Sequence, residues 1–155
     1  MEITLMTKTH AQAISLWRYD GIYSLYDHDE STAESFMDGT HFAYITTDEG
    51  LTGYFCFGED ARISTVEGYS FDGDYLDVGL GLRPDLCGKK LGSSFFAAGL
   101  AFAGELCGTT QFRLAVAVFN ERAIKVYKRA GFYVECEVTN SRYMNKFYIM
   151  KCTIR

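Results

Sequence analysis

The sequence predicts a single mixed α/β domain, in which helices cover a sheet that contains both parallel and antiparallel strands. Three observations predict it: a strand, glycine turn and helix at Leu76–Ala97, a strongly apolar strand at Gln111–Phe119, and a hairpin-like pair of strands at His41–Phe57. The 155 residues suit one domain with one core, and no repeat or linker divides them.

The N-terminal part is predicted to start with a strand and to continue with short helices. Residues 2–6 alternate polar and apolar side chains, as a half-buried strand does. Thr9 is expected to cap a helix from His10 to about Tyr19. Further helical stretches are expected at 22–27 and at 32–37, the second with Ser31 as its cap.

The next segment is predicted to form an antiparallel hairpin. Two strand-like runs, His41–Thr47 and Leu51–Phe57, flank the turn Asp48-Glu49-Gly50. Residues 58–74 are polar and contain glycine, so we expect an irregular segment with at most a short strand at 62–66.

The stretch Leu76–Ala97 is the most informative part of the chain. An apolar strand at 76–82 stops at Arg83-Pro84, a loop with glycines and lysines follows, and a helix runs from Ser93 to about Leu106. The apolar residues of this helix cover most of its surface, which predicts burial on more than one side. A strand, glycine turn and helix start present backbone N–H groups and a helix dipole to phosphate, so we expect a pyrophosphate here.

The C-terminal part is predicted to complete the sheet. Gln111–Phe119 is strongly apolar, which favours a central strand parallel to the one before the helix. Asn120 is expected to cap a helix at Glu121–Arg129. Strands at Phe132–Val138 and Tyr143–Thr153 most simply form an antiparallel pair.

Composition restricts the partners and the compartment. A net charge of −5 argues against general nucleic-acid binding and is compatible with a cationic substrate. The longest apolar run, Phe95–Ala103, is shorter than the roughly 20 residues of a membrane span, so no membrane partner is expected. The five cysteines form no CxxC pair and no signal peptide is evident, which favours the cytoplasm. His10, His28 and His41 have no metal-ligand spacing, so no metal is expected.

Two motifs resemble those of the GNAT acetyltransferases. Residues 83–93 (RPDLCGKKLGS) resemble the acyl-CoA-binding motif Gln/Arg-x-x-Gly-x-Gly/Ala, with Cys87 in place of Gln or Arg, Lys90 in place of the first glycine, and Gly92 as the second. Residues 120–132 (NERAIKVYKRAGF) resemble the second hallmark, Asn-x-x-Ala-x-x-x-Tyr-x-x-x-Gly-Phe. The resemblance implies the GNAT fold, with a mixed sheet of six to seven strands flanked by helices, and N-acetyltransferase activity with acetyl-CoA as donor.

The resemblance also implies which residues hold the acyl donor. Backbone N–H groups of Leu80 and Leu82 would contact the pantetheine and the thioester, and Asn120 would contact the pantetheine while capping its helix. The backbone of Gly88–Ser93 would bind the pyrophosphate, with positive charge from two lysines. The expected donor-binding residues are Leu80, Leu82, Cys87, Gly88, Lys89, Lys90, Leu91, Gly92, Ser93, Asn120, Ala123 and Tyr127.

Two residues are the expected catalytic groups. Tyr127 occupies the family's general-acid position, where a phenol protonates the leaving thiolate; the alternative is a core aromatic side chain. Asp77 is the best candidate for the base, and the alternative is a solvent-facing strand carboxylate. Glu67, Asp72 and Asp74 are outside candidates, and a relay through water stays open.

The expected reaction is direct attack of a primary amine, from a small molecule or a peptide N-terminus, on the thioester in a ternary complex. Two alternatives stay open: a non-catalytic acyl-CoA sensor, and an N-terminal acetyltransferase of the ribosomal-protein type. Acceptor contacts are expected in loops 19–30 and 58–74, where Asp27, Asp29 and Glu30 could attract a cationic amine. A homodimer through the aromatic strand Tyr143–Tyr148 also stays open.

Overall fold

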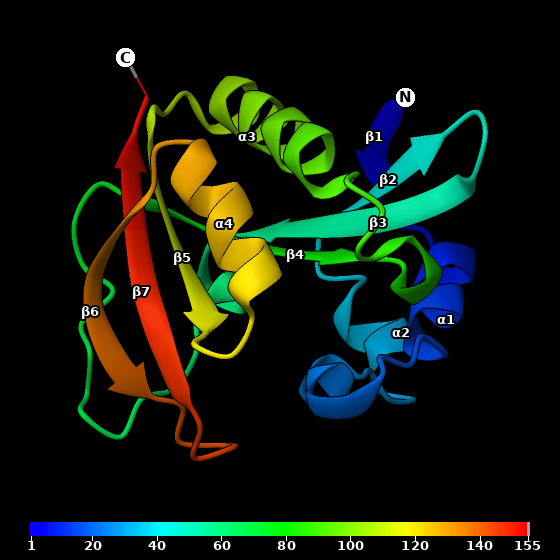
Figure 1. The fold of residues 1–155 in the computed structure, drawn as a ribbon. Helices are drawn as coiled ribbons and strands as arrows, with labels where there is room; N and C mark the ends of the chain where they lie inside the picture. The colour runs from blue at the N-terminus through cyan, green and yellow to red at the C-terminus, as the bar shows by residue number, and fades with distance from the viewer. Residues whose placement is uncertain (155) are drawn as a thin grey trace. The chain divides into compact units, whose positions relative to one another are not determined.

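The computed structural model describes residues 1–154, and its strands form one seven-stranded sheet in the order β1-β2-β3-β4-β5-β7-β6 (Figure 1). The strands are β1 (Glu2–Leu5), β2 (His41–Thr46), β3 (Gly50–Phe57), β4 (Leu76–Leu82), β5 (Gln111–Ala117), β6 (Tyr133–Thr139) and β7 (Lys146–Thr153). The helices are α1 (Lys8–Ser15), α2 (Thr32–Ser35), α3 (Gly92–Cys107) and α4 (Glu121–Arg129). The pairing of β4 with β5 is parallel and that of β1 with β2 antiparallel, which confirms the predicted mixed sheet.

The backbone divides into two compact units. The first contains residues 1–56 and 80–91, and the second contains residues 57–79 and the chain from Gly92 onward. The strand β4 contributes its first residues to the second unit and its last residues to the first. The two ends of this strand therefore have different environments.

The first unit contains the predicted hairpin. His41 pairs with Cys56 and Thr46 with Gly50, and the register shifts at Tyr44/Ile45. The helix α1 starts earlier than predicted because Thr7, not Thr9, is its cap: the Thr7 hydroxyl accepts a hydrogen bond of 3.2 Å from the His10 N–H. The hydrophobic core of this unit is a cluster of buried residues: Met6, Ala11, Ile14, Trp17 and Ala43.

Two predicted helices of the first unit differ from the expectation. Residues 21–26 form a 3-10 helix, and α2 has four residues and ends at Ser35. Ser31 makes no side-chain bond to the start of α2, because its hydroxyl donates to Asp29 instead. The local Ser–Asp bond replaces the expected helix cap.

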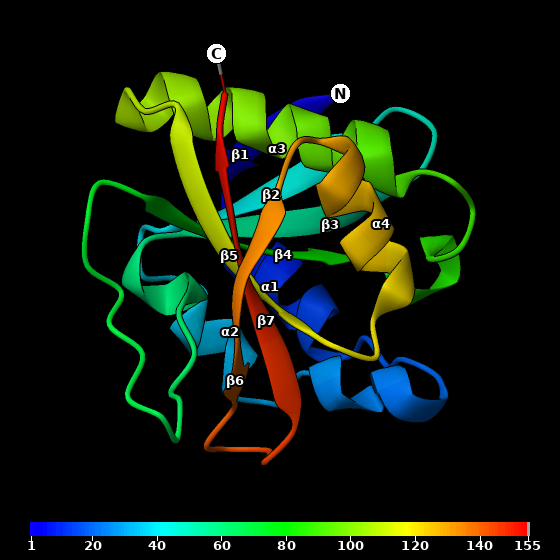
Figure 2. The same ribbon diagram turned by 60° about the vertical axis from the view of Figure 1, so that its left-hand side comes forward.

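The second unit places β7 between β5 and β6, as both views show (Figures 1 and 2). The predicted antiparallel pair of β6 and β7 is confirmed, and β7 also pairs with β5 over nearly its whole length, from Phe147 to Thr153. The strand therefore has neighbours on both sides. A homodimer through Tyr143–Tyr148 would need an unpaired edge on β7 to which the partner could add a strand. Neither edge of β7 is open, because β5 and β6 occupy them.

The helix α3 buries one face rather than most of its surface. Its buried residues follow a helical spacing: Phe95, Phe96, Gly99, Leu100 and Ala103. Leu106 is 55% exposed, so the prediction of burial on several sides is wrong at this end of the helix. Among the described residues, no helix is long and apolar enough to cross a membrane.

The segment 58–74 is irregular, as predicted, and no strand forms at 62–66. A single bridge joins Thr65 to Asn140, and the Val66 N–H donates to the Thr139 carbonyl at 2.9 Å. Glu67 strengthens the attachment, because its carboxylate accepts from the backbone N–H and the hydroxyl of Thr139 at 2.7 and 2.9 Å. The backbone N–H of Thr139 is the main reason that the pKa of Glu67 is lowered.

Candidate functional site

The last residues of β4, which belong to the first unit, contact the aromatic side chain of Tyr54 from the same unit. A methyl group added at Gly81 would lie 2.3 Å from Cε1 and 2.8 Å from Cζ of Tyr54. Trp17, Phe36 and His28 surround the Tyr54 ring, with ring centroids 6.3, 4.9 and 5.4 Å away. Another group therefore approaches the backbone closely at Gly81, and that group is the Tyr54 phenol.

Arg83 anchors the end of β4 to the turn between β2 and β3. Its guanidinium donates to the carbonyls of Glu49 and Leu51 at 2.8 and 2.9 Å and pairs with the Glu49 carboxylate at 2.7 Å. A second carboxylate, Asp85, lies 2.6 Å from its Nε. These contacts hold Arg83 in place, and the loop 83–91 begins at this residue.

The loop 83–91 contains two residues in the left-handed conformation. After a 3-10 turn at Pro84–Leu86, φ is +76° at Gly88 and +62° at Lys90. Lys90 stands where the family motif has a glycine, and its backbone adopts a conformation that glycine favours. The substitution therefore keeps the shape of the loop and adds a Cβ and an exposed ammonium.

We expect Lys90→Gly to raise the free energy of unfolding by about 0.5–1 kcal/mol, because relief of the left-handed strain exceeds the entropy that glycine adds to the unfolded chain. Urea denaturation of the purified variant measures this. Lys89→Gly is the matched control, since it removes the same charge at a residue with ordinary φ. If both variants are destabilised equally, the left-handed conformation of Lys90 does not strain the folded protein.

In the second unit, Gly92 lets α3 pack closely on α4. A methyl group added at Gly92 would lie 3.2 Å from Cγ2 of Val126, tighter than ordinary van der Waals contact. Ser93, the next residue, is exposed in the first turn of α3. The second glycine of the motif is thus explained by helix packing.

The helix α4 carries the second motif, and its start and centre are well defined. The Asn120 side chain accepts from the Ala123 N–H at 3.3 Å, which confirms the predicted cap. Tyr127 is 8% exposed, with its ring centroid 4.7 Å from Phe96 and 6.3 Å from Phe132. The ring is a core aromatic group, which leaves the role of its hydroxyl to be tested.

Asp77 has a different environment from either one expected. It is 2% exposed, and Arg113, which is fully buried, binds it through both oxygens at 2.6 and 2.8 Å. Arg62 adds a third bond of 2.8 Å. Because guanidinium donors bind both oxygens, Asp77 is an anchor inside the second unit, and its role as the base stays a prediction.

The other acidic candidates also have structural partners or lie in the open. Glu67 binds Thr139, Asp72 accepts from the Ser70 hydroxyl, and Asp74 is exposed. In the first unit, Asp27 accepts from the Tyr19 N–H at 2.7 Å and Asp29 from the Ser31 N–H at 2.8 Å. In these contacts the carboxylates accept hydrogen bonds from groups of the protein and so stabilise the loops.

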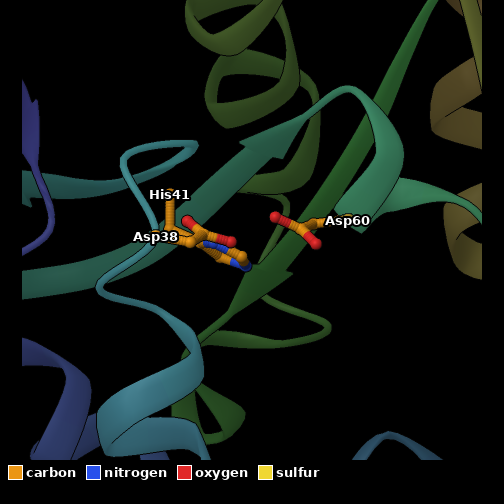
Figure 3. A group of neighbouring side chains, drawn as sticks. All are labelled: Asp38, His41 and Asp60. Carbon is orange, nitrogen blue, oxygen red and sulfur yellow. The ribbon is translucent and has the colours of Figure 1, made fainter.

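Two histidines of the first unit belong to the aromatic cluster. Burial lowers the pKa of His28 to about 4, so it is neutral at physiological pH, and its Nε2 lies 3.2 Å from the Tyr54 hydroxyl. His41 stacks on Phe36 at 4.0 Å, and its Nδ1 lies 2.9 Å from a carboxylate oxygen of Asp38 (Figure 3). The rings of His28, His41 and Phe36 pack together next to the Tyr54 ring.

A family model supports the resemblance: the model described as the acetyltransferase (GNAT) domain matches residues 3–133. The chain belongs to the GNAT acetyltransferase family. This confirms both the family and the enzyme class that the two motifs predicted. No curated protein matches this GNAT chain in sequence.

Solved structures share the fold of this chain. A chimera of the Vibrio cholerae spermidine N-acetyltransferase SpeG with hSSAT has a TM-score of 0.72 and 13% identity, over 99% of this GNAT chain and 96% of that chain. A GNAT-family acetyltransferase from Bacillus anthracis has a TM-score of 0.72 and 15% identity, over 97% and 93%. At these identities the likeness establishes the fold.

Sequence reasoning missed two tyrosines near the end of β4 in this GNAT chain. Tyr54 packs on Gly81, and Tyr19 binds the carbonyl of Leu82. Nothing in the local pattern around Tyr19 or Tyr54 indicates a contact with β4, which lies tens of residues away along the chain.

Proposed function

We propose that this chain is an acetyl-CoA-dependent N-acetyltransferase and that residues 1–155 are a single N-acetyltransferase domain. The observation that carries the proposal is the loop with left-handed Gly88 and Lys90, which leads directly into the 16-residue helix α3. Such a loop and helix start offer backbone N–H groups to a pyrophosphate. Lys89 and Lys90 are exposed and add positive charge.

The donor-binding roles follow the two family motifs. The backbone of Gly88–Ser93 would hold the pyrophosphate, with Cys87 at the start of this loop. The N–H groups of Leu80 and Leu82 would bind the pantetheine and the developing oxyanion, for which one preorganised donor is worth on the order of 3 kcal/mol. Asn120 and Ala123, at the start of α4, would contact the pantetheine.

The reaction forms a bond between the amine nitrogen and the acetyl carbon and breaks the bond between that carbon and sulfur. The Tyr127 hydroxyl would donate its proton to the departing thiolate. A phenol, with a pKa of about 10, carries its proton at neutral pH, and this value is close enough to the thiol pKa of about 8.5 for the proton to pass as the carbon–sulfur bond breaks. The amine must lose its own proton, and water would accept it, because the arginine pairs occupy Asp77.

The proposed acceptor is a small primary amine. The SpeG structures are named as spermidine N-acetyltransferases, and the net charge of −5 is compatible with a cationic acceptor. A peptide N-terminus, as in the ribosomal-protein type, is the alternative acceptor. We propose the cytoplasm as the compartment, since none of the five cysteines forms a disulfide among the described residues.

We expect Tyr127→Phe to lower kcat about a hundredfold, the contribution of a positioned general acid, while the Kd for acetyl-CoA stays within about twofold. Steady-state assays with a panel of small amines and calorimetry with acetyl-CoA measure the two quantities. Tyr143→Phe, at the exposed turn before β7, is the matched control.

The outcomes separate the proposal from its alternatives. At 100 times its Kd, acetyl-CoA should add about 2.7 kcal/mol to the free energy of unfolding of the wild type. Binding without turnover of any amine would favour the acyl-CoA sensor, and no stabilisation at millimolar acetyl-CoA would rule out both. Unchanged kcat in Tyr127→Phe would remove the acid role alone.

A further inference from the structure

One peptide group at the end of β4 is held on both of its sides. The Tyr19 hydroxyl donates to the Leu82 carbonyl at 2.8 Å, across 63 positions of the chain. The N–H of the same peptide group, which belongs to Arg83, donates to the Thr52 carbonyl at 2.8 Å. With both polar atoms bonded, this peptide plane cannot rotate without losing a hydrogen bond.

Tyr19 is itself fixed in place. Its own N–H donates to Asp27 at 2.7 Å, which closes the segment from Tyr19 to Asp27 into a loop. Burial, with smaller effects of Cys87 and Asp27, raises the pKa of the Tyr19 phenol well above its usual value. The hydroxyl therefore keeps its proton and is a permanent donor.

Cys87 turns toward the same carbonyl. Its sulfur lies 3.8 Å from the Leu82 oxygen and 3.7 Å from the Arg83 oxygen, so the thiol is directed at the strand end. The residue that replaces Gln or Arg in the family motif thus lies with Tyr19 at the Leu82 carbonyl. Tyr19 supplies the shorter and stronger of the two contacts.

We infer that Tyr19 is a positioning residue for acyl-CoA, acting through the Leu82 end of β4. The inference rests on the proposed function, which gives the Leu82 N–H a role in binding pantetheine. The Leu82 carbonyl and the Leu82 N–H belong to neighbouring peptide groups, which are joined by φ and ψ of Leu82. Holding the first peptide group therefore restricts how the second can turn, and with it the direction in which the Leu82 N–H points. Without the phenol hydroxyl, the strand end samples several directions, and binding must select the competent one.

The test is Tyr19→Phe, which removes one oxygen, with Tyr143→Phe as the matched control. We expect the Kd for both CoA and acetyl-CoA to rise about tenfold, the effect of losing a hydrogen bond that orders the site, while kcat at saturation changes less than about twofold. Calorimetry measures the Kd values, and steady-state kinetics give kcat and the KM for acetyl-CoA.

A second variant keeps the phenol and loosens its support. Asp27→Ala removes the acceptor of the Tyr19 N–H, and we expect a smaller rise in both Kd values, about threefold. If Tyr19→Phe does not fold, the two Kd values of Asp27→Ala still test the inference.

The results distinguish this inference from the proposed function. If the wild type binds acetyl-CoA but Tyr19→Phe loses melting temperature with both Kd values unchanged, Tyr19 is structural and the inference is wrong. If the wild type fails to bind acetyl-CoA, the proposed function fails first, and the role of Tyr19 fails with it.

Discussion

Asp77→Asn is expected to lower the free energy of unfolding by about 3–5 kcal/mol, because it leaves a buried guanidinium without its counter-charge. Arg113 is fully buried, and Asp77 binds its Nε and one terminal nitrogen. Arg62 is partly exposed, so water can replace its lost contact. Chemical denaturation followed by circular dichroism measures the change.

Two further variants show whether the charge or the side chain matters. Asp74→Asn, an exposed carboxylate three residues earlier, should leave the stability within about 0.5 kcal/mol. The double variant Asp77→Asn with Arg113→Met should be more stable than Asp77→Asn alone, since it also removes the stranded charge. A loss of kcat in Asp77→Asn with full stability would instead restore Asp77 as the catalytic base.

Gly81→Ala is expected to lower the free energy of unfolding by about 1–3 kcal/mol, the usual cost of overpacking. The new methyl would lie 2.3 Å from the Tyr54 ring, and Trp17, Phe36 and His28 limit the space into which the ring can turn. We also expect weaker acetyl-CoA binding, because the strand between Leu80 and Leu82 must shift. Thermal melts and calorimetry measure both effects.

The Tyr54 ring itself provides the control. Tyr54→Leu shortens the side chain and removes the atoms that the methyl would meet. In that background, Gly81→Ala should cost at least about 1 kcal/mol less than in the wild type, as a double-mutant cycle between contacting residues would show. Additive effects of the two substitutions would mean that Gly81 is required for some other reason.

Most of the fold could be predicted because its signals are local. The alternating residues of β1, the apolar run of β5 and the Asn120 cap each depend on residues close in sequence. The short helices were predicted less well. At Thr7 and Ser31 several hydroxyl and carboxylate side chains compete for the same backbone donors, and the sequence does not rank them.

The environment of Asp77 could not be predicted for a physical reason. Alternation along a strand indicates that side chains point to opposite faces, but it does not indicate what covers each face. Here Arg113 of β5 pairs with Asp77 across the parallel ladder, and Arg62 of the irregular segment reaches the same carboxylate. Both contacts depend on chain pairing, which a single sequence does not contain.

The position of β7 between β5 and β6 has a consequence for folding during synthesis. The ribosome completes β6 before β7, yet the named strand that pairs with β6 is β7. Until residues 146–153 emerge, β5 also has an open edge on that side. We therefore expect nascent chains that end before β7 to expose two unpaired strand edges and to need a chaperone that shields them.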